Sequence, residues 1–453
     1  MTAFTPADKL HRLVKQALDS GAAASIAEAE ALFAGYRLAL RIDKEAAQDR
    51  HHQAALLTAV ALARRVFLGG VSVAPLPDAP LAVPLPFGAT LAEAIVRLGA
   101  SIGEPGAGTP VIEIGAAPSA RRAPFHVRAV FAGWRGGIVP APAETAPAPA
   151  PVMALAPMLA AALAVNEAFL YVSGHLGVAG RRAVGLSLWD PAPASDWLGN
   201  VNEPGLSLLP SRLWLIGLGH LGQAYLWALG LLPFAHPQDL GLVLQDIDII
   251  TPSTESTSIL SDSTLTNVKK TRAMAAWAER RGFSTVIHER LFDSSFRRQN
   301  SEPTVALCGL DNALGRQALD QVGFDFVVEA GLGRGHRDFR AVRLHTLPAS
   351  RPAAEIWRGV QGDDQVEDRA AYKDMLARGA LDRCGVTLLA GKAVGAPFVG
   401  AVAATLALSE VLRLLHGGSI YELIDLDLNA IEYRNTVLAQ RDFSAFNPGY
   451  VVV

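Results

Sequence analysis

The stretch LWLIGLGHLGQAYLWALGLL, residues 213 to 232, decides the fold of the second half of this chain. Its apolar start has the composition of a buried strand and leads directly into Gly217, Gly219 and Gly222, which have the spacing Gly-x-Gly-x-x-Gly. Glycines at these places permit a tight turn, and the amino terminus of the helix that follows favours an anion. The stretch therefore predicts a strand, a turn and a helix that hold the phosphates of a nucleotide.

The next apolar run, LGLVLQDIDII at 240 to 250, predicts a strand that ends in two carboxylates, Asp246 and Asp248. An acid at the carboxyl end of this strand is where a ribose hydroxyl is held in nucleotide-binding folds. A structural glycine-rich turn beside a surface acidic pair is the alternative. The two segments together favour the nucleotide site.

Strands and helices alternate through the rest of this half. A helix is expected over 267–282, and further strands are expected in 284–291, 304–310 and 326–332. This order predicts a mostly parallel sheet covered by helices, so residues 201–453 are expected to form a doubly wound, Rossmann-like α/β domain.

The first half, residues 1–200, has strand-like runs but no second glycine fingerprint, and Pro, Gly, Asn and Asp cluster before residue 205. AALAVNEAF at 161–169 and ATLALSEVL at 404–412 follow one pattern of small, apolar and acidic residues. Alanine-rich helices also resemble one another by chance. A true duplication would make residues 1–200 a degenerate, related α/β domain. The proline- and alanine-rich run at 140–151 is expected to be an exposed loop or tether.

Composition limits the kind of protein. The net charge of −3 provides no basic excess for nucleic acid, and two cysteines form no disulfide framework. The apolar run 153–172 contains Asn166 and Glu167, so a core helix is expected there and no membrane span. The first residues lack a signal-peptide pattern. We therefore expect a globular cytoplasmic protein that binds neither nucleic acid nor a membrane.

Charged residues after the second strand indicate the chemistry. Lys270 stands at the start of the helix expected over 267–282, and Asp311, Asn312 and Arg316 follow a later strand in LDNALGR. A carboxylate for Mg²⁺ and an ammonium for phosphate suit ATP. A nicotinamide-dependent oxidoreductase is the weaker alternative, because no Tyr-Lys or His-Asp arrangement follows the fingerprint.

GLGHLG, QDIDII, Lys270, LDNALGR and GAPFVGAVAATLALSEVLRLLHGG together resemble the ubiquitin-activating-enzyme-like superfamily, which includes ThiF and MoeB, over about residues 211–440. The resemblance implies that Asp246 holds ribose, Lys270 holds phosphates and Asp311 holds magnesium. It implies ATP and Mg²⁺ as cofactors, a ubiquitin-like protein as the partner that is adenylated at its carboxyl terminus, and a ubiquitin-conjugating-like enzyme as the next acceptor. It also allows a homodimer.

The chain departs from the family pattern at one place. TEST, residues 254–257, stands where family members usually carry Asn-x-x-Arg, so an arginine that faces phosphate is missing. Arg272, or an arginine from the other half, is expected to replace it. The alternatives are a degenerate nucleotide site and a noncatalytic scaffold that binds a small protein or peptide.

Cys384 lies in ARGALDRCGVTLL, 377–389, within a segment at about 378–396 where related enzymes of the autophagy type carry a catalytic cysteine. A nucleophilic thiol needs access and positive charge, and Arg378, Arg383 and Lys392 are close in sequence. We expect thioester formation at Cys384, and a thiol without a role is the alternative. A two-part chain of this kind is similar to the activating enzymes of Bil-type antiviral defence operons.

Overall fold

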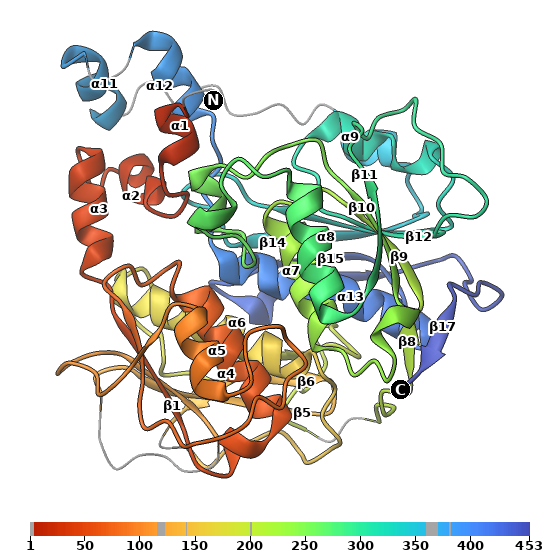
Figure 1. The fold of residues 1–453 in the computed structure, drawn as a ribbon, viewed down its shortest axis with the longest axis horizontal. Helices are drawn as coiled ribbons and strands as arrows, with labels where there is room; N and C mark the ends of the chain where they lie inside the picture. The colour runs from red at the N-terminus through yellow and green to blue at the C-terminus, as the bar shows by residue number, and fades with distance from the viewer. Residues whose placement is uncertain (1–3, 116–122, 142, 200–201, 359–369, 380–381) are drawn as a thin grey trace.

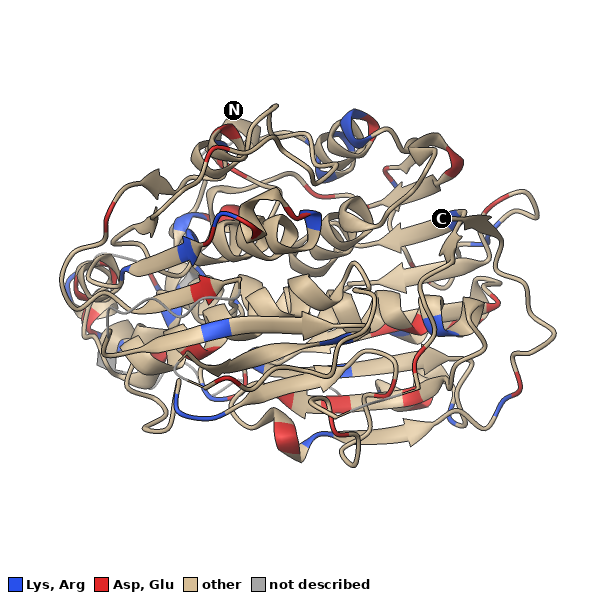
Figure 2. Cartoon of the chain, turned by 90° about the horizontal axis from the view of Figure 1, so that it is seen from below, with Lys and Arg blue, Asp and Glu red and all other residues tan. Residues whose placement is uncertain are grey.

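The computed structural model describes residues 4–115, 123–141, 143–199, 202–358, 370–379 and 382–453. It contains two large sheets, one built from each half of the chain, with helices between them (Figure 1). In the side view of Figure 2, acidic and basic residues are interspersed along the chain.

The first sheet has the strand order β3-β2-β1-β4-β5-β6-β7. Its strands are β1 Leu38–Ile42, β2 Val71–Val73, β3 Ser101–Ile102, β4 Val111–Ile114, β5 His126–Ala132, β6 Arg135–Pro140 and β7 Val184–Ser187. Its helices are α1 Pro6–Lys9, α2 Lys15–Ser20, α3 Ile26–Ala34, α4 Arg50–Ala63, α5 Leu91–Arg97 and α6 Ala156–Val172.

The second sheet has the order β11-β10-β9-β12-β13-β14-β15-β16. Its strands are β9 Arg212–Ile216, β10 Gly241–Gln245, β11 Ser284–His288, β12 Val305–Cys308, β13 Phe326–Leu332, β14 Ala341–Leu347, β15 Tyr421–Asp427 and β16 Asn435–Leu438. Its helices are α7 His220–Leu231, α8 Lys270–Arg281, α9 Ala313–Gln317, α10 Ala353–Ile356, α11 Ala370–Ala377, α12 Arg383–Ala390 and α13 Pro397–Leu415. The short strands β8 Leu208–Pro210 and β17 Tyr450–Val452 pair separately.

The predicted Rossmann-like α/β fold is confirmed, with one difference in the second sheet. Strands β9 to β13 run parallel, but β14, β15 and β16 are antiparallel additions that the sequence patterns did not indicate. Strands β14 and β15 are partly exposed on one face, so their apolar residues do not form the continuous runs of a buried parallel strand.

The two sheets repeat one topology. Each has five parallel strands, β3-β2-β1-β4-β5 in the first sheet and β11-β10-β9-β12-β13 in the second. Each then ends in antiparallel strands, with α6 and α13 at corresponding places in the chain order. The repeated sequence pattern lies on these two helices, and it places Glu167 and Glu410 in buried positions, where they pair with Arg182 and Arg413. The two halves therefore share one α/β topology, and their predicted origin by duplication stays a prediction. The predicted boundary at 200/201 falls on residues outside the described ones.

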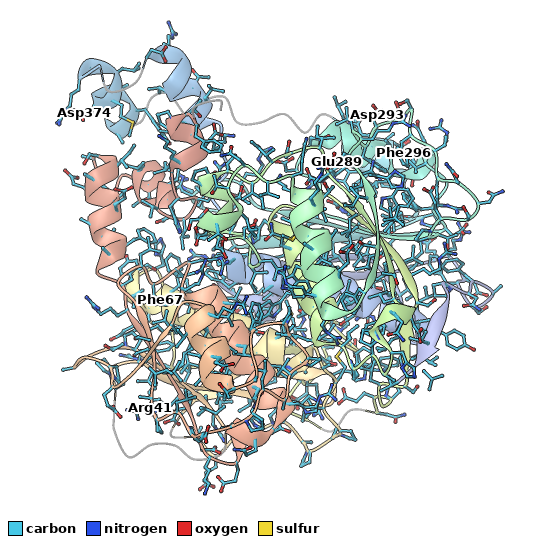
Figure 3. The ribbon with its side chains drawn as sticks, viewed as in Figure 1. Arg41, Phe67, Glu289, Asp293, Phe296 and Asp374 are labelled. Carbon is cyan, nitrogen blue, oxygen red and sulfur yellow. The ribbon has the colours of Figure 1, made fainter. Side chains whose placement is uncertain are left out.

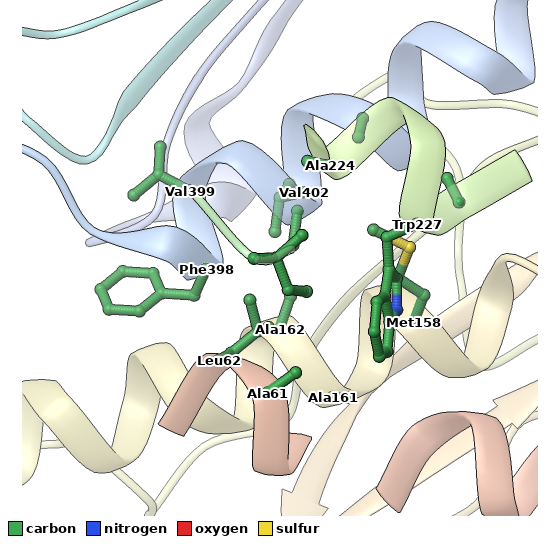
Figure 4. Packing of buried hydrophobic residues seen from close by; sticks show 14 of the residues in the cluster. Ala61, Leu62, Met158, Ala161, Ala162, Ala224, Trp227, Phe398, Val399 and Val402 are labelled. Carbon is green, nitrogen blue, oxygen red and sulfur yellow. The ribbon is translucent and has the colours of Figure 1, made fainter. Parts of the chain in front are cut away.

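Helices α4, α6, α7 and α13 pack together between the sheets and form one core. Figure 4 shows Ala61, Ala161 and Ala162 of the first half facing Trp227 and Val402 of the second. Small alanine side chains let the helices approach closely. Within the described residues, α13 has the length and apolar composition of a membrane span, but 89% of its apolar window is buried in the protein.

The proline- and alanine-rich run is attached to the first sheet over part of its length, in contrast to the expected exposed loop. One guanidinium nitrogen of Arg128 donates to the carbonyls of Ala143 and Thr145, both at 3.0 Å, and Arg135 donates to Ala148 at 2.7 Å. The half-buried Arg128 and the buried Arg135 on the sheet thus donate to this segment, which sequence composition alone cannot indicate.

The helices α1, α2, α11 and α12 lie together at one corner of the molecule, beside the two sheets (Figure 1). Tyr372 of α11 donates a 2.5 Å hydrogen bond to Asp19 of α2, which also pairs with Lys15 at 2.6 Å. Lys392 lies 3.7 Å from Asp8 of α1. The segment that contains Cys384 is therefore packed on the amino-terminal helices.

Candidate functional site

A cavity of about 750 Å³ lies at the carboxyl ends of β9, β10 and β12. This edge of a doubly wound sheet is where ligands bind in such folds. Residues from both halves line it. The lining includes Arg12, Gly217, Gly219, His220, Asp246, Asp248, Ser253, Thr257, Lys270, Asp311, Asn312, Arg316, Leu332, Gly333, Arg334, Phe339, Lys392, Val394 and Gly395.

The glycine-rich turn has the tight backbone that its spacing predicts. Gly217 has a φ of +82°, and a Cβ at Gly222 would lie 2.1 Å from the carbonyl oxygen of Gly217. The backbone N–H of Leu218 donates to Asp246 Oδ2 at 2.7 Å, and that of Asp248 donates to Oδ1 at 2.8 Å. Asp246 therefore fixes the turn relative to β10, and a ligand role for it stays a prediction.

Lys270 is the first residue of α8 and reaches into the cavity. Its Nζ lies 2.8 Å from Asp248 Oδ2 and 3.7 Å from Asp246 Oδ2, and its side chain is 14% exposed. Burial lowers the pKa of Lys270, but the two carboxylates outweigh burial, so the pKa lies above its ordinary value. The ammonium is charged and available to an anion.

Asp311, Asn312 and Arg316 line the same cavity, but two of them have structural partners. Asn312 caps α9 by accepting from the N–H of Gly315 at 2.6 Å. Arg316 donates from Nε to the carbonyl of Leu310 at 2.9 Å and lies 2.9 Å from Glu329. Asp311 is exposed and has no hydrogen-bond partner among the residues that the structure describes. Their roles toward a nucleotide stay predictions.

Arg12 is the lining residue that sequence reasoning did not single out. It comes from the first half, its NH2 group lies 3.2 Å from Ser253 Oγ, and its backbone N–H donates to Ser256 Oγ at 3.1 Å. Burial lowers the pKa of Arg12, and the charges of Asp8 and Asp311 oppose that change. A single arginine in a polar helical start carries no sequence signal. Only the packing of the halves brings it to the cavity.

The other expected replacement, Arg272, faces elsewhere. Its side chain is 68% exposed and pairs with Glu289 at 2.8 Å, near the start of α8 in Figure 3. Because Lys270 and Arg272 are two residues apart on one helix, they point in different directions. Of the two expected replacements, the arginine from the other half is the one that lines the cavity.

Two further arginines of the first half hold the loop in which the family arginine is missing. Arg64 pairs with Glu255 at 2.5 Å, and Arg65 donates to the carbonyls of Ile259 at 2.9 Å and Ser261 at 2.8 Å. Gln223 of α7 then hydrogen-bonds the hydroxyl of Ser261 and the carbonyl of Leu218. The first half is thus linked through this loop to the glycine-rich turn.

Cys384 is the second residue of α12, a helix capped by Asp382, and its side chain lies outside the described residues. Two of its expected basic neighbours have carboxylate partners: Arg378 lies 2.8 Å from Asp374, and Lys392 lies 3.7 Å from Asp8. Arg383 also has a partner. The nucleophilic role of Cys384 stays a prediction.

The corresponding edge of the first sheet carries its own carboxylates. Asp43 follows β1 and accepts from the N–H of Ala46 at 2.8 Å. Asp49 caps α4 and accepts from the N–H groups of His51 and His52 at 3.0 and 2.9 Å. These fixed negative charges stand at helix starts, which elsewhere favour an anion, and the predicted inactivity of the first half toward nucleotides stays a prediction.

Comparison with known proteins identifies the chain. Family models described as the BilD C-terminal domain and the BilD N-terminal domain match residues 209–418 and 37–188. The bacterial E1-like protein BilD of Collimonas sp. (strain OK412) is 46% identical over 427 residues, which cover 92% of this chain and 90% of that protein.

Solved structures show weaker similarity. E. coli MccB with ATP is 14% identical with a TM-score of 0.35, and the match covers 51% of this chain and 64% of MccB. E. coli TcdA, a tRNA N6-threonylcarbamoyladenosine dehydratase, is 12% identical with a TM-score of 0.30, over 46% of this chain and 86% of TcdA. These low similarities decide nothing about activity. On the sequence match over nine tenths of its length, the chain belongs to the BilD family of bacterial E1-like proteins.

Proposed function

We propose that this protein uses ATP to adenylate the carboxyl terminus of a ubiquitin-like protein, holds the product as a thioester on Cys384, and passes it to a conjugating enzyme. The observation that carries the proposal is the meeting of Arg12, Lys270 and Asp311 in one cavity beside a glycine-rich turn. Two cations and one carboxylate there suit a triphosphate with magnesium.

In the first step, a carboxylate oxygen of the carrier attacks the α-phosphorus of ATP and pyrophosphate leaves. Lys270 and Arg12 balance the charge that passes to the pyrophosphate oxygens, and the turn at 217–222 places the phosphates at the start of α7. Asp246 holds the turn in place through Leu218.

Asp311 is the residue that fits magnesium. It is exposed, lines the cavity and has no hydrogen-bond or ion-pair partner among the described residues. In that part of the chain, no group of three or more acidic, histidine or cysteine side chains could hold a metal alone. One carboxylate with phosphate oxygens and water is an ordinary magnesium environment. The ion, when bound, neutralises phosphate charge.

In the second step, the Cys384 thiolate attacks the carbonyl carbon of the acyl-adenylate. A carbon–sulfur bond forms, the bond from that carbon to the phosphate oxygen breaks, and AMP leaves. Segment 391–395 lines the cavity just beyond α12, which supports the supply of a thiol from this side.

The test is carrier-dependent ATP-pyrophosphate exchange by the purified chain with a ubiquitin-like protein encoded beside its gene. Exchange that needs the carrier's free carboxyl terminus is expected. A noncatalytic scaffold is the second candidate, because the loop at 254–257 lacks the family arginine. Carrier binding with no exchange would favour the scaffold.

A further inference from the structure

Two segments, 332–334 and 391–395, form the end of the cavity beside β13, which β9 and β12 separate from β10 and the Asp246 that follows it. They are joined by a hydrogen bond from the N–H of Val394 to the carbonyl oxygen of Arg334 at 2.8 Å. Phe339, which is buried and packed against Phe169, lies beside Gly333 and also lines the cavity.

This end leads to the nucleotide side of the cavity. A Cβ built on Gly395 would lie 3.0 Å from Thr257 and 3.9 Å from the ring of His220, which belongs to the glycine-rich turn. Lys392 stands farther out, where it faces Asp8. The segment 391–395 therefore runs inward along the cavity. Its hydrogen bond to Arg334 is made by Val394, one residue before the inner end at Gly395.

The charges along this path are unequal. The acidic lining residues among the described ones, Asp246, Asp248 and Asp311, all follow β10 or β12 at the nucleotide end. The charged lining residues of the segments 332–334 and 391–395 are Arg334 and Lys392. Arg334 is exposed, and no described carboxylate pairs with it. Charge complementarity therefore favours an anionic group beside Arg334.

We propose that Arg334 selects carriers with an acidic side chain near the carboxyl terminus. The proposal rests on the proposed function, which places the carrier's last residues at this end. An extended chain advances about 3.3 Å per residue, so the residues that shortly precede the terminus pass along this part of the cavity, where a carboxylate can pair with the guanidinium. The pairing is a charge-assisted hydrogen bond at a partly open site.

The experiment uses the full chain and two fluorescent peptides that end in Gly-Gly. They are identical except that one has two Glu and the other two Gln at the third and fourth residues from the terminus. Fluorescence anisotropy in low salt, with a nonhydrolysable ATP analogue present, gives both dissociation constants. The acidic peptide is expected to bind about fivefold more tightly, the effect of one exposed ion pair.

Arg334→Gln is expected to abolish the preference. Arg337→Gln is the matched control, because Arg337 is exposed on the same turn but is not among the lining residues, and the preference should persist in it. Equal affinities in the native chain, a preference that survives Arg334→Gln, or no binding of either peptide at millimolar concentration overturns the proposal. Failure of the proposed function alone gives a different result: the acidic peptide still binds more tightly, but no carrier supports ATP-pyrophosphate exchange.

Discussion

The ammonium of Lys270 lies 2.8 Å from the carboxylate of Asp248 in the cavity beside the glycine-rich turn. Asp248 is 63% exposed, so this ion pair is weakened by solvent and a phosphate can displace the carboxylate. Lys270 is thus held in position for an anion before the anion arrives.

Removal of this ammonium should weaken ATP use. Lys270→Ala is expected to raise the KM for ATP and lower kcat/KM by about a hundredfold, the effect of losing one charge-stabilising donor. Arg272→Ala is the control, since Arg272 pairs with Glu289 outside the cavity, and it should leave exchange unchanged. Full activity of Lys270→Ala would place the phosphates elsewhere.

Asp311→Asn keeps the shape of the side chain and removes the charge that suits magnesium. Carrier-dependent exchange is expected to be lost, while the thermal midpoint stays close to that of the native chain, because Asp311 is exposed. Excess Mg²⁺ should partly restore exchange if Asp311 acts through the metal. Exchange at the native rate by the folded variant would remove Asp311 from the site.

Loss of Arg12, which comes from the first half, should impair ATP use as strongly as loss of Lys270 from the second half. Arg12→Ala is expected to lower kcat/KM for ATP by about a hundredfold, and Arg12→Lys should recover only part of the loss, because an ammonium lacks the planar fork. Arg64→Ala tests whether contact between the halves explains the effect, since Arg64 holds Glu255 of the same loop without lining the cavity. A smaller loss in Arg64→Ala supports a direct role of Arg12.

Substitution of each cysteine should distinguish a reactive thiol, Cys384, from a buried packing residue, Cys308. Cys384→Ala is expected to keep carrier-dependent exchange and to lose the carrier-linked band on a non-reducing gel. Cys308 is fully buried and burial raises its pKa to about 12, so it should resist alkylation at neutral pH. A thiol-sensitive adduct that remains in Cys384→Ala but disappears in Cys308→Ala would contradict the assignment.

His11 should make folding depend on pH. Its Nδ1 accepts from the N–H groups of Leu13 and Val14, and burial lowers its pKa to about 4. Since the folded pKa is below the unfolded value, the neutral, buried His11 contributes its full stability above about pH 6.5. That contribution to the free energy of unfolding is lost as the pH falls toward 4. His11→Asn keeps an acceptor without titrating, so its thermal midpoint should fall less between neutral pH and about pH 4.5. An unchanged pH profile would show that His11 does not contribute.

The sequence predicted the parts of the site that depend on local pattern. The glycine spacing, the acids after β10 and Lys270 at the start of α8 all lie on elements that periodicity identifies. Arg12 and Arg65 could not be predicted, because their roles depend on how two distant segments pack. The antiparallel strands β14 to β16 were missed for a related reason, since half-exposed strands lack a continuous apolar run.

The repeated strand order has a consequence for how the protein behaves when it is dilute. Two equal subunits that share one site separate at low concentration and lose that site. Here the halves are covalently joined, so Arg12 remains at a high effective concentration near Asp311 at any dilution. Joining also relieves the copies of the need to be identical. The first copy carries Asp43 and Asp49 at its own helix starts, and it contributes Arg12 to the cavity and Arg65 to the neighbouring loop of the second copy.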